Sequence, residues 1–396
     1  MNVRHVQLHD FRNHTSTKLE LGSGVNVIFG KNGQGKTNVL EAISCLCLTK
    51  SFYAASDETL AQIGKDRFEV EGLLGSDAGT DYRVRLAYVR GTREKAFTIN
   101  SARPDRLGSV IGMFPVVILS PENNAITFGA PSDRRRFIDL VLSQLSRSYF
   151  DDLLEYRRVL RQRNRLLGDA KIQGSAVRED ALVPWNTGIV DYGTRIIHRR
   201  WRFVNEFIPY VASAYRDMVE TQERPEMLYE TVAHGTSLEA PETIAVEIRD
   251  QLQSRSAEEC RRGLSLVGPH RDELVFKING INLQNYASQG QHKTFLVALK
   301  IAEFFYLKEN KGETPILLLD DVLSELDDTR SSRLLEHVAD LGQTIITTTD
   351  ESVLSDQVYR EGKNRRFYVE HGTCKPITAD SGKVKEAPTT AWRSAE

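Results

Sequence analysis

The sequence predicts an α/β fold whose body is built from both ends of the chain and is interrupted by a mainly helical insertion. Three observations lead to this prediction. Strand-like runs occupy most of the chain before residue 120, helical periodicity dominates residues 131–252, and strand-like runs return from residue 274. With 396 residues the chain is long enough for two domains. We therefore expect mixed sheets with flanking helices and a separate helical lobe.

The N-terminal elements follow from alternation and apolar runs. Residues 3–21 alternate polar and apolar side chains, which predicts a hairpin-like pair of strands. Residues 25–29, Val-Asn-Val-Ile-Phe, form a dense apolar run typical of a buried strand, and residues 37–48 carry apolar side chains at helical spacing. Residues 68–119 return to strand patterns separated by turns.

The middle of the chain reads as helices. Phe150, Leu153, Tyr156 and Leu160 lie at helical spacing on one face, while Arg157, Arg161 and Arg165 follow one another four residues apart on another. Residues 168–184, rich in small and charged residues, are expected to be an interhelical loop.

The C-terminal part supplies a strand at 274–278, helices at 291–307 and 330–341, and apolar strands at 316–319 and 344–348. These elements divide the chain into a head of residues 1–130 plus 260–372, a helical insertion of residues 131–259, and a tail of residues 373–396. The tail is polar and rich in small residues, so we expect it to be disordered.

Composition excludes several classes of protein. Hydrophobic residues make up 40% and charged residues 27%, as in an ordinary globular chain. No run of about 18 apolar residues occurs, and the first residues do not resemble a signal-peptide core, so we expect a cytoplasmic protein with no membrane partner. The four cysteines are too scattered for a disulfide framework or a zinc site and are expected to be reduced thiols.

The net charge of −2 conceals an uneven distribution. Between Arg134 and Arg202 there are 15 Lys and Arg against 8 Asp and Glu, an excess of seven positive charges. Such a segment is either a solvated helical surface or a surface for nucleic acid. Composition alone leaves both interpretations open.

A phosphate-binding motif connects the predicted strand at 25–29 to the following helix. Its residues, Gly30, Lys31, Asn32, Gly33, Gln34, Gly35, Lys36 and Thr37, match G-x-x-x-x-G-K-[ST] in the required strand–loop–helix context. The glycines let successive N–H groups point at phosphate oxygens, and the helix adds its positive N-terminal end. Lys36 is expected to reach the β and γ phosphates, and the Thr37 hydroxyl to ligate Mg²⁺.

An acidic pair follows the apolar strand at 316–319. Asp320 is the candidate metal-shell carboxylate, and Asp321 is a candidate general base for the attacking water. The alternative for Asp321 is a helix N-cap.

A second Ser/Gly-rich turn, Ser288-Gln289-Gly290-Gln291, stands at the start of a predicted helix and is a further potential phosphate cradle. The interval from Lys36 to Asp320 is far too long for a compact nucleotide kinase or a small GTPase.

In these motifs the sequence resembles the ABC-type ATPase heads of the SMC/Rad50 group and, within it, the RecF family of bacterial recombination mediators. The resemblance extends over residues 3–349. It includes the P-loop with residues 38–43, Phe11-Arg12-Asn13, Ser120-Pro121-Glu122, Gly129-Ala130-Pro131, Gly268-Pro269-His270-Arg271-Asp272, Ser288 to Gln291 and the segment from Leu319 to Asp327.

The resemblance implies a function and a set of site residues. It implies an ABC-type P-loop ATPase head that binds ATP and Mg²⁺, with Arg12 and Asn13 on the adenine side of the nucleotide. It implies that Ser288, Gly290 and Gln291 complete the site of a partner subunit. It also implies an ATP-switched homodimeric clamp that binds single-stranded, duplex or gapped DNA. If the basic segment forms the DNA-binding surface, the candidate contacts are Arg134, Arg135, Arg157, Arg161 and Arg165.

The biological role implied by the resemblance is recombination mediation in replication and repair. This comprises gap repair, recombinase loading and SOS induction, with weak DNA-stimulated ATP hydrolysis and the partners RecR and RecO. The rival classes are transporter ATPases, whose helical insertion is shorter, and Rad50- or SMC-like proteins, whose arms need hundreds of residues.

Two features remain open at the level of sequence, the loop that carries Tyr53 and the pair His270 and Arg271, and two others favour one interpretation. Tyr53 stands where such proteins commonly have an Arg, which leaves a phosphate or DNA contact from that loop in question. Thr349-Asp350 replaces the switch histidine of transporter ATPases. His270 and Arg271 are either structural or in contact with nucleotide. Trp185 and Trp201 are expected to lie in the core of the helical insertion rather than to act as base-stacking platforms.

Overall fold

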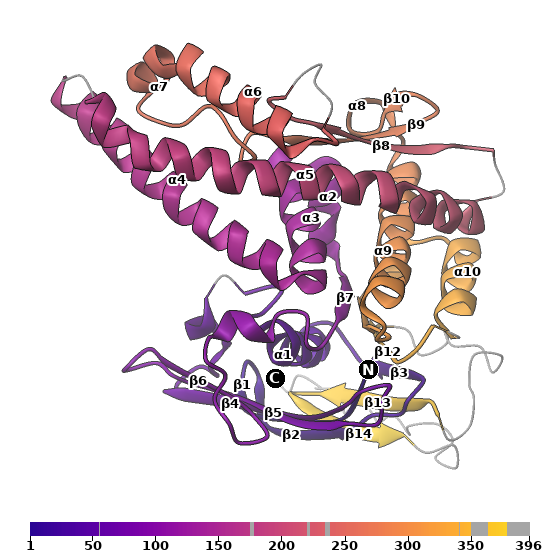
Figure 1. Cartoon of the computed structure of the whole chain (residues 1–396). Helices are drawn as coiled ribbons and strands as arrows, with labels where there is room; N and C mark the ends of the chain where they lie inside the picture. Colours follow the sequence, from indigo (N-terminus) through magenta and orange to yellow (C-terminus); the bar gives the residue numbers. More distant parts are fainter. Residues whose placement is uncertain are drawn as a thin grey trace, which may run out of the picture.

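The computed structural model describes residues 1–54, 56–174, 178–219, 222–233, 238–339, 341–349 and 363–377. Sheets and one central helix form a lower body, and long helices form an upper lobe that extends to one side (Figure 1). The expected tail from residue 378 onward lies outside the described residues, as does Asp350.

An antiparallel sheet covers one side of the body in the strand order β2-β1-β4-β5-β6. Its strands are β1 (Asn2–Phe11), β2 (His14–Glu20), β4 (Arg67–Gly75), β5 (Asp81–Val89) and β6 (Glu94–Ile99). On β5, buried Val84, Leu86 and Tyr88 alternate with more exposed residues, so one face packs on the core and the other faces solvent. The predicted N-terminal hairpin is confirmed as the β1–β2 pair.

A second sheet has the order β14-β13-β3-β12-β11-β7. Its strands are β3 (Val25–Phe29), β7 (Val116–Leu119), β11 (Ile316–Asp320), β12 (Thr344–Thr348), β13 (Arg365–Glu370) and β14 (Thr373–Ile377). All pairings are parallel except β13–β14. Because parallel strands end at the same edge, the ends of β3 and β11 are brought together. The expectation of a disordered tail from residue 373 is wrong for residues 373–377, which pair with β13.

The described part of the chain forms the helices α1 (Lys36–Leu48), α2 (Asn124–Phe128), α3 (Pro131–Leu145), α4 (Arg147–Gln173), α5 (Glu179–Met218), α6 (Pro241–Ser254), α7 (Ser256–Arg262), α8 (Leu283–Tyr286), α9 (Gln289–Lys311) and α10 (Asp328–Ala339). Short 3₁₀ turns span Asp57–Leu60, Leu107–Val110, Pro121–Asn123 and Leu323–Glu325.

The predicted interhelical loop at 168–184 is much shorter in the structure. Helix α4 continues through Gly168 and ends at Gly174, a left-handed residue with φ 62°, while Pro184 lies inside α5. A glycine inside a helix costs about 1 kcal/mol in propensity. Gly168 packs closely against Gly263, which follows α7. A Cβ added to Gly263 would stand 3.4 Å from the Cα atom of Gly168.

The expected boundaries of the insertion do not correspond to a break in the packing. Strand β8 (Pro225–Glu230) lies inside the insertion and pairs with β9 (Glu273–Ile278), which was assigned to the head, and β10 (Ile281–Asn282) completes this sheet. One hydrophobic cluster runs from β3 through α3, α4 and α5 to α9. The helical lobe therefore shares its core with the head, which connects it mechanically to the helix that carries Ser288.

Candidate nucleotide site and adjoining polar network

The P-loop keeps its shape through glycines whose neighbours approach too closely for a side chain. A Cβ on Gly30 would stand 2.4 Å from the carbonyl oxygen of Val369, and one on Gly35 would stand 2.3 Å from Oδ1 of Asn13. Gly35 also has φ 108°, a conformation that L side chains rarely adopt. Lys31, Asn32 and Gly33 are exposed at the mouth of the loop. The loop is thus backed by β1–β2 and β13 and open on its outer side.

Gln34 anchors the loop rather than presenting its side chain outward. Its carbonyl oxygen accepts hydrogen bonds from Nδ2 of Asn13 at 2.8 Å and from the N–H of Gly372 at 3.1 Å. Its Oε1 accepts the N–H of His371 at 2.6 Å. Two segments more than 330 residues apart in sequence therefore hold the P-loop.

Lys36 is buried inside the loop, with 7% of its surface exposed. Its ammonium group donates to the carbonyl oxygens of Gly30 at 2.7 Å and Lys31 at 3.0 Å. Burial lowers the pKa of Lys36, and the negative charges of Asp321 and Asp320 oppose that shift. The cation is held at the centre of the loop, where the sequence motif predicts the terminal phosphates of a nucleotide.

Asp320 lies at the end of β11 and accepts two hydroxyl hydrogen bonds. Thr37 Oγ1 and Thr347 Oγ1 donate to its Oδ1 at 2.8 Å and 2.7 Å. Burial raises the pKa of Asp320, and the two threonine hydrogen bonds oppose that shift. The predicted partnership of Thr37 with Asp320 is present in the geometry. Thr347 was missed as a site residue, although the parallel register that places it opposite Asp320 was implied by two adjacent apolar strands.

Asp321 adopts a left-handed conformation with φ 50°. Its N–H donates to Thr347 Oγ1 at 2.9 Å, and its Oδ1 is buried without a partner among the residues that the structure describes. The N-cap alternative does not describe this residue, because Oδ1 of Asp327 accepts the N–H of Arg330 at the start of α10. An unpartnered buried carboxylate oxygen beside Lys36 and Asp320 indicates a site for a further polar group.

Arg12 and Asn13 lie beside the P-loop, in the turn between β1 and β2. The guanidinium of Arg12 donates to both oxygens of Glu41 at 2.8 Å and 2.7 Å, and this bonding raises its pKa. Asn13 Oδ1 accepts a hydrogen bond from Asn38 at 2.7 Å. Both residues hold the neighbouring elements together, and their predicted role on the adenine side stays a prediction.

Ser288 caps α9 and is exposed. Its hydroxyl accepts the N–H of Gln291 at 3.2 Å, and the Gln291 side chain accepts the N–H of Ser288 at 2.9 Å. Gln291 Nε2 also donates to Glu223 at 2.9 Å. Gly290 accepts from Thr294 through its carbonyl oxygen. Within the described part of the chain, none of these bonds reaches the P-loop of the same subunit.

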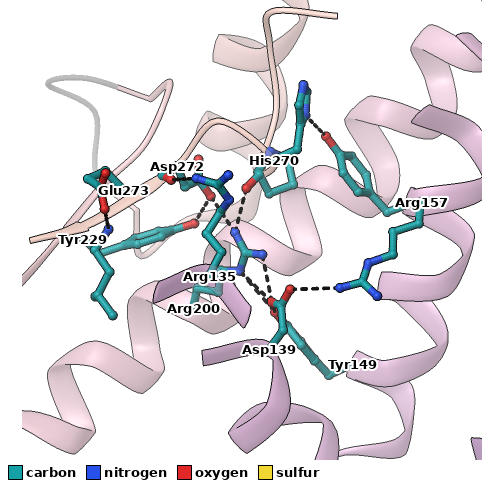
Figure 2. A network of polar contacts seen from close by, with 12 residues as sticks. Arg135, Asp139, Tyr149, Arg157, Arg200, Tyr229, His270, Asp272 and Glu273 are labelled. Atoms are coloured by element: carbon teal, nitrogen blue, oxygen red, sulfur yellow. Dashed lines mark hydrogen bonds and ion pairs between the residues drawn. The ribbon is translucent and has the colours of Figure 1, made fainter. Parts of the chain in front are cut away.

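A buried polar network joins the helical lobe to the segment 268–272 (Figure 2). Arg200 of α5 donates to Asp139 of α3 at 2.8 Å, to Asp272 at 3.1 Å and to the carbonyl oxygen of Pro269 at 2.7 Å. Tyr149 donates to Asp139, and Tyr229 donates to Asp272. Arg200 is 2% exposed and Asp272 is 1% exposed, so this network is part of the core.

The two residues left open by the sequence, His270 and Arg271, make bonds within the protein. His270 pairs through Nδ1 with the Tyr156 hydroxyl at 2.6 Å and through Nε2 with the carbonyl oxygen of Ser265 at 3.1 Å. Burial lowers the pKa of His270 to about 4. Arg271 donates to the same carbonyl oxygen at 2.8 Å. These contacts favour the structural alternative for both residues.

The arginines expected to contact DNA fall into two groups. Arg134 is 4% exposed and bonds both oxygens of Glu273, so the expectation that it meets DNA is wrong for this buried side chain. Arg135 donates to the carbonyl oxygen of Asp272 at 2.7 Å and is half-buried. Arg157, Arg161 and Arg165 are exposed along α4. Arg163, between them in sequence, is buried in an ion pair with Glu259 and belongs to the core.

Two side chains offer oxygen ligands suited to a magnesium ion. The Thr37 hydroxyl and the Asp320 carboxylate are hard oxygen ligands, and Mg²⁺ in phosphate-binding proteins is commonly held by one or two such groups together with the phosphates. Across the described residues, no cluster of three or more His, Cys, Asp or Glu side chains could hold a metal by itself. Across the same residues, no helix has the length and apolar character needed to span a bilayer.

The comparisons with known proteins agree with this architecture. Residues 2–363 match the family model of the RecF/RecN/SMC N terminal domain. The DNA replication and repair protein RecF of Salinibacter ruber is 40% identical over 351 residues, which cover 88% of this chain and 85% of that protein. The chain belongs to the RecF family.

Solved structures of RecF and SMC heads place the fold in the same class. A structure of the recombination mediator protein RecF-ATPrS in the RecFOR pathway superimposes with a TM-score of 0.87 at 31% identity, covering 95% of this chain and 98% of that one. An SMC head bound to the C-winged helix domain of ScpA gives a TM-score of 0.55 at 13% identity, covering 95% of this chain and 98% of that chain. The predicted ABC-type ATPase fold is therefore confirmed.

Proposed function

We propose that this RecF-family chain is an ATP-dependent, DNA-binding recombination mediator that acts in replication and repair as an ATP-switched homodimer. The observation that carries the proposal is the convergence of Lys36, Thr37 and Asp320 at one edge of the parallel sheet. Support comes from relatives described as DNA replication and repair proteins and from solved structures described as RecF-ATP and RecF-ATPrS.

The residues of the loop explain how ATP would be held. The N-terminal end of α1 favours negative charge, and the buried Lys36 ammonium supplies a full positive charge beside it. Thr37 and Asp320 would hold Mg²⁺, which neutralises the developing charge on the β- and γ-phosphates when it is bound. Asp321, whose Oδ1 is unpartnered among the described residues, is the candidate to accept a proton from the attacking water.

The second phosphate cradle would act across a dimer. Ser288 and Gly290 open α9, a helix of 23 residues whose N-terminal end is exposed. Their bonds within the described chain do not involve its own P-loop, so they are available to the γ-phosphate held by a second subunit. Two such contacts in a two-fold dimer would bury two ATP molecules, and hydrolysis would loosen the interface.

Light scattering tests this mechanism directly. ATP with Mg²⁺ should convert the monomer to a dimer, and ADP should not. Ser288→Arg should still bind ATP but neither dimerise nor hydrolyse it. Ser254→Arg, at an exposed position at the end of α6, is the matched control and should dimerise normally. A chain that stays monomeric with ATP bound, or a Ser288→Arg variant that dimerises, would refute the proposal.

The remaining parts of the proposal concern DNA. Arg157, Arg161 and Arg165 of α4 would contact phosphates without reading bases. Slow hydrolysis stimulated by DNA, gap repair, recombinase loading, SOS induction and association with RecR and RecO belong to the same proposal. Gel shifts with single-stranded, duplex and gapped DNA, with and without ATP, test it. Hydrolysis that DNA does not stimulate would instead favour an SMC/Rad50-type or transporter-type ATPase with another partner.

A further inference from the structure

A cavity lies between the loop after α1 and helices α3 and α4, and none of the P-loop residues line it. Its volume is about 440 Å³, within the range of sites that take small molecules. We call it the α1–α4 cleft and define it by Lys50, Phe52, Tyr53, Arg136, Phe150 and Arg157, which all line it. Phe52 and Tyr53 come from the loop after α1, and Phe150 and Arg157 from α4.

Three cationic side chains of this cleft, Lys50, Arg136 and Arg157, give it an excess of positive charge. Lys50 and Arg136 are exposed, and 56% of the Arg157 side chain is exposed. Among the described residues, the only carboxylate within ion-pair distance of any of the three is Asp139, 3.5 Å from Arg157. That carboxylate is already bonded by Arg200 at 2.8 Å. The three positive charges are therefore left largely without neutralising partners.

The electrostatics at Lys50 agree with this description. Partial burial lowers the pKa of Lys50, and the positive charges of Arg136, Arg157 and Lys95 lower it further. An ammonium group destabilised by neighbouring cations is a favourable place for an anion, because a bound anion removes the repulsion. The local field of the protein thus points to an anionic ligand.

Other charged groups of the cleft do not cancel this field. Lys300 is buried and paired with Glu303 at 2.7 Å. Asp133 accepts the N–H of Ala130 at the start of α3. Glu122, which lies in the 3₁₀ turn before α2, also lines the cleft and is exposed. The carboxylates of Glu122 and Asp133 therefore offset only part of the charge of the three exposed cations.

The rest of the lining is aromatic. Tyr53 is 57% exposed, and Phe52 and Phe150 are half-buried. One face of Tyr53 lies under the guanidinium of Arg12, at 5.9 Å from carbon to ring centroid. Aromatic rings beside cations are the combination that proteins use for unpaired nucleotides, because the base stacks while the phosphate is neutralised.

We propose that the α1–α4 cleft binds one nucleotide unit, its phosphate held by Lys50, Arg136 and Arg157 and its unpaired base against the aromatic wall. The inference rests on the proposed function in one respect, since a DNA strand would be the natural source of that unit. A free nucleoside monophosphate offers the same chemistry. Tyr53, which is 57% exposed, would then contribute stacking.

The experiment measures binding of a fluorescent oligodeoxythymidine of about eight nucleotides to the full chain with ATP present. Arg136→Glu and Lys50→Glu should each lower its affinity by about tenfold or more. Arg158→Glu is the matched control, because Arg158 is an exposed arginine next in sequence to the cleft residue Arg157 but does not line the cleft. ATP binding by each variant serves as the test of folding.

Further arms separate the aromatic contact and the source of the ligand. Tyr53→Ala should weaken binding of the oligodeoxythymidine but not of an abasic strand of equal length. Competition by deoxythymidine monophosphate would support the cleft with the free monomer as its source. Strand binding without such competition, but with sensitivity to Arg136→Glu, would support it with the strand as its source.

Failure of the cleft proposal and failure of the proposed function give different results. Equal losses in Arg136→Glu and Arg158→Glu, or no loss in either, would overturn the cleft while leaving ATP-dependent duplex binding and the proposed function untouched. Absence of duplex binding by the unsubstituted chain would instead overturn the proposed function.

Discussion

The central arginine of the buried network offers the sharpest test of how the helical lobe is joined to the head. Arg200→Met keeps much of the aliphatic length of the side chain but removes its guanidinium. That group bonds Asp139 of α3 and, in the segment 268–272, Asp272 and the carbonyl oxygen of Pro269 (Figure 2). The substitution leaves two buried carboxylates without their main counter-charge.

The expected magnitude follows from what remains after the substitution. Removing one partner of a buried ion pair costs about 3–5 kcal/mol. Asp139 would retain the Tyr149 hydroxyl and a distant Arg157, and Asp272 would retain the Tyr229 hydroxyl. These remaining contacts place the expected loss at the lower end, about 3 kcal/mol.

Urea unfolding followed by circular dichroism measures this loss. Arg202→Met is the matched control on the same helix, since Arg202 is 60% exposed and pairs with Glu206 at i,i+4. Such surface pairs contribute about 0.3–0.5 kcal/mol. An Arg200→Met variant no less stable than Arg202→Met would refute the reasoning.

The pH dependence of the same variant separates lost charge from lost packing. In Arg200→Met the buried carboxylate of Asp272, whose pKa burial raises, would bind a proton more readily in the folded state, so the deficit should shrink as the pH is lowered from about 8 to about 5. A purely steric defect would give a deficit that does not change with pH.

The other predictions address the two sites and one titrating group. Lys36→Ala should lower ATP affinity by more than about tenfold in isothermal titration calorimetry, and normal affinity would refute the P-loop assignment. Reversing Arg161 and Arg165 to Glu should weaken DNA binding and reduce the slope of log affinity against log salt by about 1 per arginine; an unchanged slope would mean a merely solvated helix face. His270 has a depressed pKa of about 4 against an ordinary 6.5, so its contribution to stability is fully present above pH 6.5 and is lost as the pH falls toward 4. The free energy of unfolding from urea titrations over this range should fall more steeply for the unsubstituted chain than for His270→Gln, by up to about 3 kcal/mol, and parallel curves would contradict the assignment.

Local patterns were sufficient for the elements that carry chemistry. The P-loop, the strand before it and Asp320 were predicted because each is encoded by adjacent residues, and the structure places Thr37 2.8 Å from Asp320. The hairpin at residues 3–21 was likewise predicted from alternation alone. In these places the chain's period and its glycines leave few alternative conformations.

Local patterns did not predict where helices end or which arginines are buried. Residues 168–173 and 179–184 of the expected loop at 168–184 are helical, and Gly168 packs close to Gly263. Arg134 and Arg163 read as surface charge in sequence, yet each is buried beside a carboxylate more than 90 residues away. A local pattern carries no information about such a partner.

The sequence by itself determined the phosphate-binding chemistry, because the loop and the acidic strand end are each written in consecutive residues. The tertiary structure alone decided which charges are free to meet a ligand. Arg157 is exposed while Arg200 is buried, although both stand in the same basic segment. The difference arises because burying an ion is favourable only where folding brings an opposite charge to it, and folding brought Asp139 and Asp272 to Arg200.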